Sequence, residues 1–103
     1  MTDTFDMPWV RGNILDEAKK LVSDDREADY GSAFESFNSI AELWSHFIRT
    51  KYLINIDLTA EDVGMLMVLL KVSRTATTQK FKLDSFIDIA GYAALAAEMG
   101  ARD

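Results

Sequence analysis

The chain has 103 residues, of which 49% are hydrophobic and 27% charged, and it contains no cysteine. This length suits one domain over residues 1–103, and the missing thiols exclude disulfides, thiolate zinc sites and cysteine nucleophiles. The formal charge of −6 disfavours binding to nucleic-acid polymers and to anionic membranes. No apolar run is long enough to span a membrane and the first residues are acidic, so we expect a cytoplasmic protein.

The first part of the chain predicts an arm, a helix and a loop. Residues 1–12 are expected to be extended, because Pro8 disfavours the helical conformation in the residue before it. Asn13 suits a helix N-cap, and apolar residues at helical spacing follow it to about Ser23. The polar stretch 24–31 ends in a glycine and is typical of a loop.

Two further helices follow this loop. Ser32 and Glu35 form a Ser-x-x-Glu capping box, and the apolar spacing after it continues to the region 49–53. Thr59 begins the third helix, and the stretch 63–72 is apolar nearly all round. A helix without a polar face is typical of the centre of a bundle, so we expect the third helix to be buried.

The last helix is predicted after a flexible polar connection over residues 75–80. It is expected to run from about Asp84 to Met99, with Gly100 as its stop signal. Its segment 90–97 is rich in small residues, which favours close approach of another helix, from this chain or from a second copy. The elements predict an all-α fold, a compact bundle of four main helices over residues 13–99. We expect the small-residue face to form a homo-oligomer, a dimer or a higher assembly.

Acidic residues stand near the starts of the third and fourth helices. Glu61 and Asp62 lie in the first turn of one, while Asp84 and Asp88 are spaced i, i+4 on the other. If the two helix starts lie together, these carboxylates form a site for Mg²⁺ or Mn²⁺, which prefer oxygen ligands. The alternatives are ordinary helix-dipole contacts and helix caps for Glu61 and Asp62, and a partly buried ion pair for Asp88.

The middle of the chain is locally basic, since residues 49–82 carry 6 basic and 3 acidic side chains. Lys71, Arg74 and Lys82 are candidates for contacts with phosphate oxygens. The alternative is a solvated helix end that complements the helix dipole. Three more polar residues lie around the loop before the second helix: Arg26, Tyr30 and Asn38. They are candidates for hydrogen bonds to a base or a sugar. The alternative is that they hold the loop in place by local hydrogen bonds.

The stretches 61–66 and 84–92 resemble the two acidic helices of the all-α nucleoside triphosphate pyrophosphohydrolases, the MazG-like superfamily. That family carries Glu-x-x-Glu on one helix and Glu-x-x-Asp on the next, which together hold magnesium for attack on a triphosphate. Asp88 matches the final Asp of the second motif. Three positions depart from the expected glutamates: Met65, Val68 and Ser85. The resemblance implies a magnesium-dependent hydrolase, and these departures put a full multi-metal site in doubt.

A second resemblance covers residues 14–99. The runs that carry it are Asp29-Tyr30-Gly31, Ile40-Ala41-Glu42-Leu43-Trp44, Leu69-Leu70-Lys71-Val72-Ser73-Arg74 and Asp88-Ile89-Ala90-Gly91-Tyr92. They resemble a family of small uncharacterised phage and prophage proteins. This resemblance implies a viral origin and a place in the host cytoplasm, and it brings no established activity.

The sequence therefore favours a phage protein that binds a nucleotide or a nucleotide-derived small molecule without hydrolysing it. Sequestration of a host signalling nucleotide is one such role, by analogy. A magnesium-dependent pyrophosphohydrolase is the second hypothesis, and a protein-interaction module that inhibits a host factor is the third. The observation that separates them is whether Asp62, Asp84 and Asp88 converge within reach of one ion, with basic side chains facing them. If these carboxylates point apart into separate helix caps, both nucleotide hypotheses lose their main support.

Overall fold

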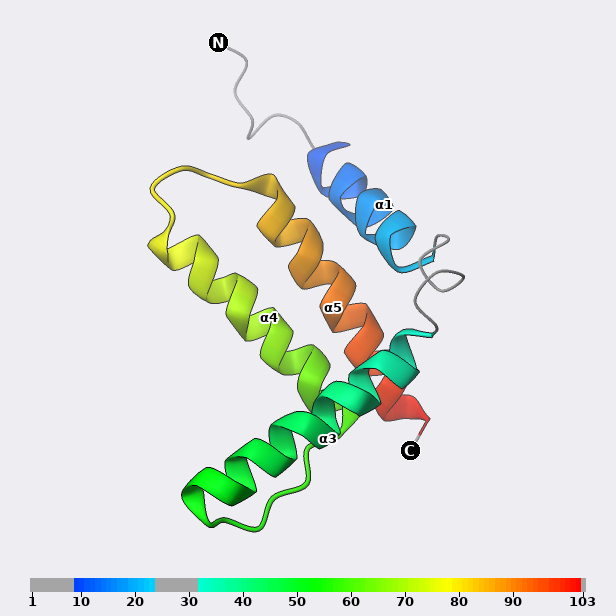
Figure 1. Cartoon of the computed structure of the whole chain (residues 1–103). Helices are drawn as coiled ribbons and strands as arrows, with labels where there is room; N and C mark the ends of the chain where they lie inside the picture. The colour runs from blue at the N-terminus through cyan, green and yellow to red at the C-terminus, as the bar shows by residue number, and fades with distance from the viewer. Residues whose placement is uncertain (1–8, 24–31, 103) are drawn as a thin grey trace.

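The computed structural model describes residues 9–23 and 32–102, and this part of the chain is all-α (Figure 1). Its helices are α1 (Trp9–Ser23), α3 (Ala33–Tyr52), α4 (Ala60–Thr77) and α5 (Leu83–Ala101). The predicted all-α fold with four main helices is confirmed. The expected loop over residues 24–31 and the first eight residues of the expected arm lie outside the described residues. Within the described ranges, no helix is both long and apolar enough to cross a membrane.

α1 begins earlier than the sequence predicted. Its first residue is Trp9, directly after Pro8, so the expectation of an extended arm is wrong for residues 9–12. Proline restricts the residue before it, whereas the residues after it are free to enter a helix. The helix ends at Ser23, as expected.

Local hydrogen bonds mark both ends of α3. Ser32 Oγ accepts the Glu35 backbone N–H at 3.1 Å, which satisfies one of the free donors at the helix start. At the other end Leu53 adopts the left-handed conformation with φ 56°, and its N–H donates to the Arg49 carbonyl at 3.0 Å. α3 therefore stops at Tyr52, inside the predicted region.

α4 and α5 are each longer than expected. Thr75 Oγ1 donates to the Val72 carbonyl at 2.7 Å, and Thr77 Oγ1 donates to the Ser73 carbonyl at 3.1 Å. α4 ends at Thr77, so residues 75–77 of the predicted flexible connection are helical instead, and their threonine hydroxyls bond back to the preceding turn. α5 continues through Gly100 to Ala101, so that glycine is not its stop.

α4 and α5 form an antiparallel hairpin, since residues 78–82 make a short connection. Figure 1 shows α1 alongside α5 on the side away from α4, and α3 lying across the end of the hairpin where α4 begins. The core lies at this crossing. Its buried residues come from α3, α4 and α5: Phe37, Ala41, Ala60, Val63 and Met99.

Small residues set how closely α5 packs on its neighbours. A Cβ at Gly64 would lie 2.7 Å from the Ala96 Cβ, so a larger residue would not fit between α4 and α5 at this point. Gly91 faces α1, where a Cβ would lie 3.5 Å from a methyl carbon of Val22. The small residues of α5 thus serve packing within the chain, while association of copies through that face stays a prediction.

α4 is not buried on all sides, so this expectation is wrong. One face packs against α5 and α3, and there Val63 is fully buried. The other face carries side chains that are 40% to 59% exposed: Met65, Leu66, Leu69, Leu70 and Val72. α5 lies between α4 and α1, whereas α4 contacts α5 along its length and α3 near its start (Figure 1). An apolar sequence pattern shows which side chains are hydrophobic, and it does not show whether another helix covers them.

Candidate functional site

The four predicted metal ligands do not come together. Because α4 and α5 are antiparallel, the start of α4 lies beside the end of α5, and a Cβ at Gly100 would lie 2.6 Å from Glu61 Oε1. Asp84 stands at the start of α5, at the opposite end of the hairpin. In the part of the chain that the structure describes, no group of three or more acidic or histidine side chains could hold a metal ion. The expected convergence is wrong, because two helix starts meet only in a parallel pair. Binding of Mg²⁺ or Mn²⁺ by a smaller set of ligands stays a prediction.

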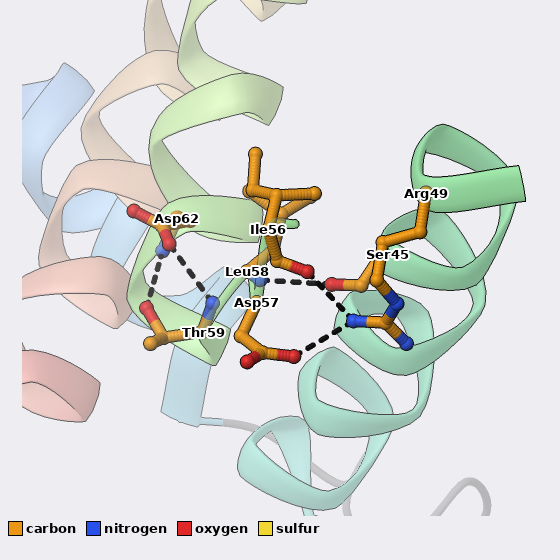
Figure 2. A network of polar contacts seen from close by, with 7 residues as sticks. All are labelled: Ser45, Arg49, Ile56, Asp57, Leu58, Thr59 and Asp62. Atoms are coloured by element: carbon orange, nitrogen blue, oxygen red, sulfur yellow. Dashed lines mark hydrogen bonds and ion pairs between the residues drawn. The ribbon is translucent and has the colours of Figure 1, made fainter. Parts of the chain in front are cut away.

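Asp62 takes part in capping α4. Its carboxylate accepts the Thr59 backbone N–H at 2.9 Å, and Thr59 Oγ1 accepts the Asp62 N–H at 3.2 Å (Figure 2). These two bonds form a complete capping box. The predicted alternative, an ordinary role at the helix start, is therefore what the structure shows for Asp62.

Two side chains of α3 form hydrogen bonds to the connection between α3 and α4, next to this cap. The buried Ser45 hydroxyl accepts the Leu58 N–H at 2.8 Å. Arg49 Nη1 donates to the Ile56 carbonyl at 2.6 Å and to the Asp57 carboxylate at 2.7 Å. Figure 2 shows both α3 side chains pointing toward the connection. We therefore assign this polar network a structural role.

Asp88 and Lys71 form an ion pair between α5 and α4. Lys71 Nζ lies 2.9 Å from Asp88 Oδ2, and the side chains are 18% and 28% exposed. A carboxylate that is half-buried on an apolar helix needs a counter-charge, because desolvation penalises an unpaired ion. Of the two alternatives for Asp88, the structure shows the ion pair. A predicted metal ligand and a predicted phosphate ligand are thus bound to each other.

A hollow of about 170 Å³ lies at the end of the hairpin opposite α3, where α4 ends and α5 begins. Its walls come from the last turns of α4, from the connection, and from the start of α5. The lining residues are Arg74, Thr75, Thr78, Gln79, Lys80, Phe81, Lys82, Ser85 and Phe86. This hollow is the candidate site.

The candidate site is basic. Arg74, Lys80 and Lys82 supply three positive charges, and none of the described lining residues is acidic. Within residues 9–23 and 32–102, none of these three cations forms an ion pair. Lys82 is also the N-cap of α5 and makes no side-chain cap hydrogen bond. The remaining first-turn N–H groups of α5 and the positive end of its dipole add to the attraction for an anion, while the Asp84 carboxylate in the same turn opposes it.

Two phenyl rings belong to the same hollow. Phe81 and Phe86 stack with ring centroids 5.4 Å apart and an angle of 25° between the ring planes. Phe81 is 76% exposed and Phe86 is 42% exposed. An exposed aromatic ring beside positive charges is a surface on which a planar base stacks.

The structure brings together two of the predicted ligand residues, Arg74 and Lys82, which both line the hollow. Lys71 is held in its ion pair with Asp88. Asn38 is half-buried on α3, which crosses the other end of the hairpin. Two predicted ligand residues lie outside the described residues: Arg26 and Tyr30.

Sequence reasoning missed the aromatic and hydroxyl parts of the site. The run Lys80-Phe81-Lys82 is the signal that could have shown them, because it places an aromatic ring between two cations in a polar connection. Alternation of this kind is typical of surfaces that contact both phosphates and bases. Ser85 and Phe86 carry no such signal, since they reach the hollow only through the fold of the hairpin.

Residues 13–100 of the chain match the family described as Domain of unknown function (DUF6378). The gene 55 protein of Mycobacterium phage L5 is 36% identical over 87 residues, which are 84% of this chain and 52% of that protein. The gene 55 protein of Mycobacterium phage D29 is 37% identical over 81 residues, which are 79% of this chain and 49% of that protein. The chain thus spans about half the length of these curated relatives. No solved structure matches it.

These matches confirm the predicted resemblance to small uncharacterised phage proteins. They bring no activity to the chain. The resemblance to MazG-like pyrophosphohydrolases gains no support from them and stays a prediction, as does a place in the host cytoplasm.

Proposed function

The chain belongs to the DUF6378 family, and we propose that it binds a nucleotide or a nucleotide-derived small molecule in the basic hollow between α4 and α5. The observation that carries this proposal is that Arg74, Lys82 and Phe81 line one hollow. Two cations and an exposed ring match the two chemically different halves of a nucleotide, its phosphates and its base.

The phosphate half is recognised by the cations and the start of α5. Arg74 offers a planar guanidinium that donates two parallel hydrogen bonds to phosphate oxygens, and Lys82 adds a mobile positive charge. Ser85 supplies a hydroxyl donor in the first turn of α5. Helix starts attract phosphate through their free N–H groups, so the three contributions act on the same group.

The base half lies on the aromatic rings. A hollow of about 170 Å³ is smaller than the roughly 300–1,000 Å³ of pockets that enclose a whole small molecule. It suits the phosphates, which leaves the base to stack on the exposed part of the Phe81 ring. Stacking of a base on an aromatic side chain contributes about 1–3 kcal/mol.

The proposal is binding without hydrolysis. The described lining residues include no carboxylate or histidine to act as a general base. The carboxylates that the pyrophosphohydrolase hypothesis needs are placed elsewhere, with Asp62 in a helix cap and Asp88 in an ion pair. A small binder without hydrolysis suits a phage protein that sequesters a host signalling nucleotide, by analogy.

Calorimetric titration tests the proposal directly. The wild-type chain is titrated with mononucleotides, nucleoside triphosphates, cyclic dinucleotides and inorganic triphosphate, each with and without Mg²⁺. We expect binding of at least one of them without Mg²⁺. Replacing Arg74→Gln and Lys82→Gln together should weaken that binding at least about tenfold, because each charge-assisted hydrogen bond contributes about 1.5–3 kcal/mol.

The matched control is Lys20→Gln with Lys51→Gln, which removes the same charge from α1 and α3. It should keep the wild-type affinity. Equal weakening by both double variants would show only bulk electrostatic attraction, and no binding to any compound would end the proposal. A requirement for Mg²⁺ together with release of pyrophosphate would instead establish the hydrolase hypothesis.

A further inference from the structure

The size of the hollow between α4 and α5 restricts which kind of phosphate can enter it. Its volume is about 170 Å³, whereas pockets that enclose a whole small molecule have roughly 300–1,000 Å³. A terminal phosphate is joined to the rest of a nucleotide by one ester bond, so it can enter while the sugar stays outside. The phosphate of a cyclic nucleotide is joined to the sugar by two ester bonds, so the sugar would have to enter with it. The hollow therefore suits a terminal phosphate better.

The cations of the hollow favour the more highly charged phosphate. Arg74 comes from the last turn of α4, and Lys80 and Lys82 come from the connection. The acidic residue that follows them, Asp84 in the first turn of α5, offsets only part of this positive charge. A phosphate monoester carries about −1.5 to −2 charges at pH 7, and a diester carries about −1. The same cations therefore attract a monoester more strongly than a diester.

The aromatic surface of the hollow has room for one base. Phe81 and Phe86 stack on each other with ring centroids 5.4 Å apart, so Phe86 covers one face of the Phe81 ring. Phe81 is 76% exposed, which leaves its other face for a base. A mononucleotide carries one base, whereas a cyclic dinucleotide carries two bases on a ring closed by two diesters. One stacking face beside one small hollow therefore matches the mononucleotide.

We propose that the hollow selects linear nucleotides that end in a phosphate monoester over cyclic nucleotides and cyclic dinucleotides. This inference rests on the proposed nucleotide binding and narrows its ligand class. Three properties act in the same direction: the small volume of the hollow, the charge of its cations, and the single stacking face of Phe81. A signalling nucleotide that this chain sequesters is then a linear one.

Matched pairs of ligands test the selection by calorimetric titration without Mg²⁺. One pair is adenosine monophosphate with cyclic adenosine monophosphate, and the other is the same pair with guanine as the base. Within a pair the base and the sugar are the same, so only the phosphate differs. For at least one base, the wild-type chain should bind the linear member at least about tenfold more tightly, which is the effect of one charge-assisted hydrogen bond. Cyclic dinucleotides of the same bases should bind no better than the cyclic mononucleotides.

The pH dependence shows whether the charge of the phosphate is a cause of the selection. The second pKa of a phosphate monoester is about 6, so a monoester loses one negative charge as the pH falls through this value, while a diester keeps its charge. The described residues that line the hollow include no histidine, whose charge would change over the same range. Affinity for the linear member should therefore fall between about pH 7.5 and pH 5.5, and affinity for the cyclic member should change little.

Lys80→Gln tests the part that the cations play. It should lower the ratio of the two affinities by about threefold, because the lost charge attracts the monoester more than the diester. The matched control is Lys20→Gln on α1, which should keep the ratio of the wild-type chain. An equal change of the ratio in both variants would overturn the role of the hollow in the selection.

Two outcomes separate this inference from the proposed function. Equal or tighter binding of a cyclic compound, lost in Arg74→Gln with Lys82→Gln, would overturn the selection and leave the proposed nucleotide binding in place. Absence of binding to every linear and cyclic compound would overturn both.

Discussion

The two ends of the α4–α5 hairpin use their polar side chains in opposite ways. At the α3 end, Ser45 and Arg49 bond to the connection, and Thr59 and Asp62 cap α4 (Figure 2). At the far end Arg74, Lys80 and Lys82 line a hollow and form no ion pair with the described residues. At the α3 end the polar side chains stabilise the fold, whereas the cations at the far end are available to a ligand.

The comparison separates residues that look alike in the sequence. Arg49 and Arg74 both lie near the end of a helix in the basic segment 49–82. Arg49 is satisfied by a carbonyl and a carboxylate, whereas Arg74 faces a hollow. Loss of the first should reduce stability, and loss of the second should reduce binding. The following predictions test this division.

The largest effect on stability is expected at the α3 end, from Ser45→Ala. Ser45 is 2% exposed and accepts the Leu58 N–H, so its removal leaves that donor without a partner. The free energy of unfolding should fall by about 2 kcal/mol. Urea denaturation measures it, with Ser39→Ala on the exposed face of α3 as the control. A loss equally large in the control would show a general helix effect instead.

A smaller effect is expected where α4 approaches α5. Gly64→Ala puts a Cβ 2.7 Å from the Ala96 Cβ, and the strain should outweigh the gain in helix propensity by about 1 kcal/mol. Gly91→Ala makes only an ordinary contact at 3.5 Å and should stabilise the chain by up to about 1 kcal/mol. Thermal unfolding of both variants measures the contrast. Adding Ala96→Gly to Gly64→Ala should recover only part of the loss, because the Ala96 Cα stays 3.1 Å from the new Cβ. Equal melting temperatures for Gly64→Ala and Gly91→Ala would contradict the close approach.

The smallest effect is expected at the hollow. Arg74→Gln with Lys82→Gln should change the free energy of unfolding by less than about 0.5 kcal/mol, because neither side chain forms an ion pair within the described residues. Urea denaturation of this double variant, beside its titration with nucleotides, measures both properties on one sample. A stability loss comparable to that of Ser45→Ala would assign these cations to the fold.

Much of the local structure was predictable from the sequence. The cap at Ser32, the start of the third helix at Thr59 and the end of the first helix at Ser23 all agree with the structure. Each depends on residues within one or two turns of each other, so short-range spacing suffices. The prediction of an extended conformation for residues 9–12 was wrong, because Pro8 restricts the residue before it and not the residues after it.

The candidate site was predictable only in part. Arg74 and Lys82 were found from local basic character, and both line the hollow. Phe86 and Ser85 were missed, because they reach it only once α5 folds back on α4. The predicted carboxylate site was wrong for a related reason. Spacing in the sequence does not show that α5 runs antiparallel to α4, which places Glu61 and Asp84 at opposite ends of the hairpin.

Residue order alone settled the all-α class, most helix ends, the caps and the basic character of the segment 49–82. These properties depend on spacing within a helix and on composition. Tertiary structure decided that Asp88 pairs with Lys71, that α5 lies between α1 and α4, and that the apolar side chains of Met65, Leu69 and Val72 on α4 are exposed. The physical reason is that contacts between distant segments depend on how helices pack, and an apolar face accepts any complementary apolar partner.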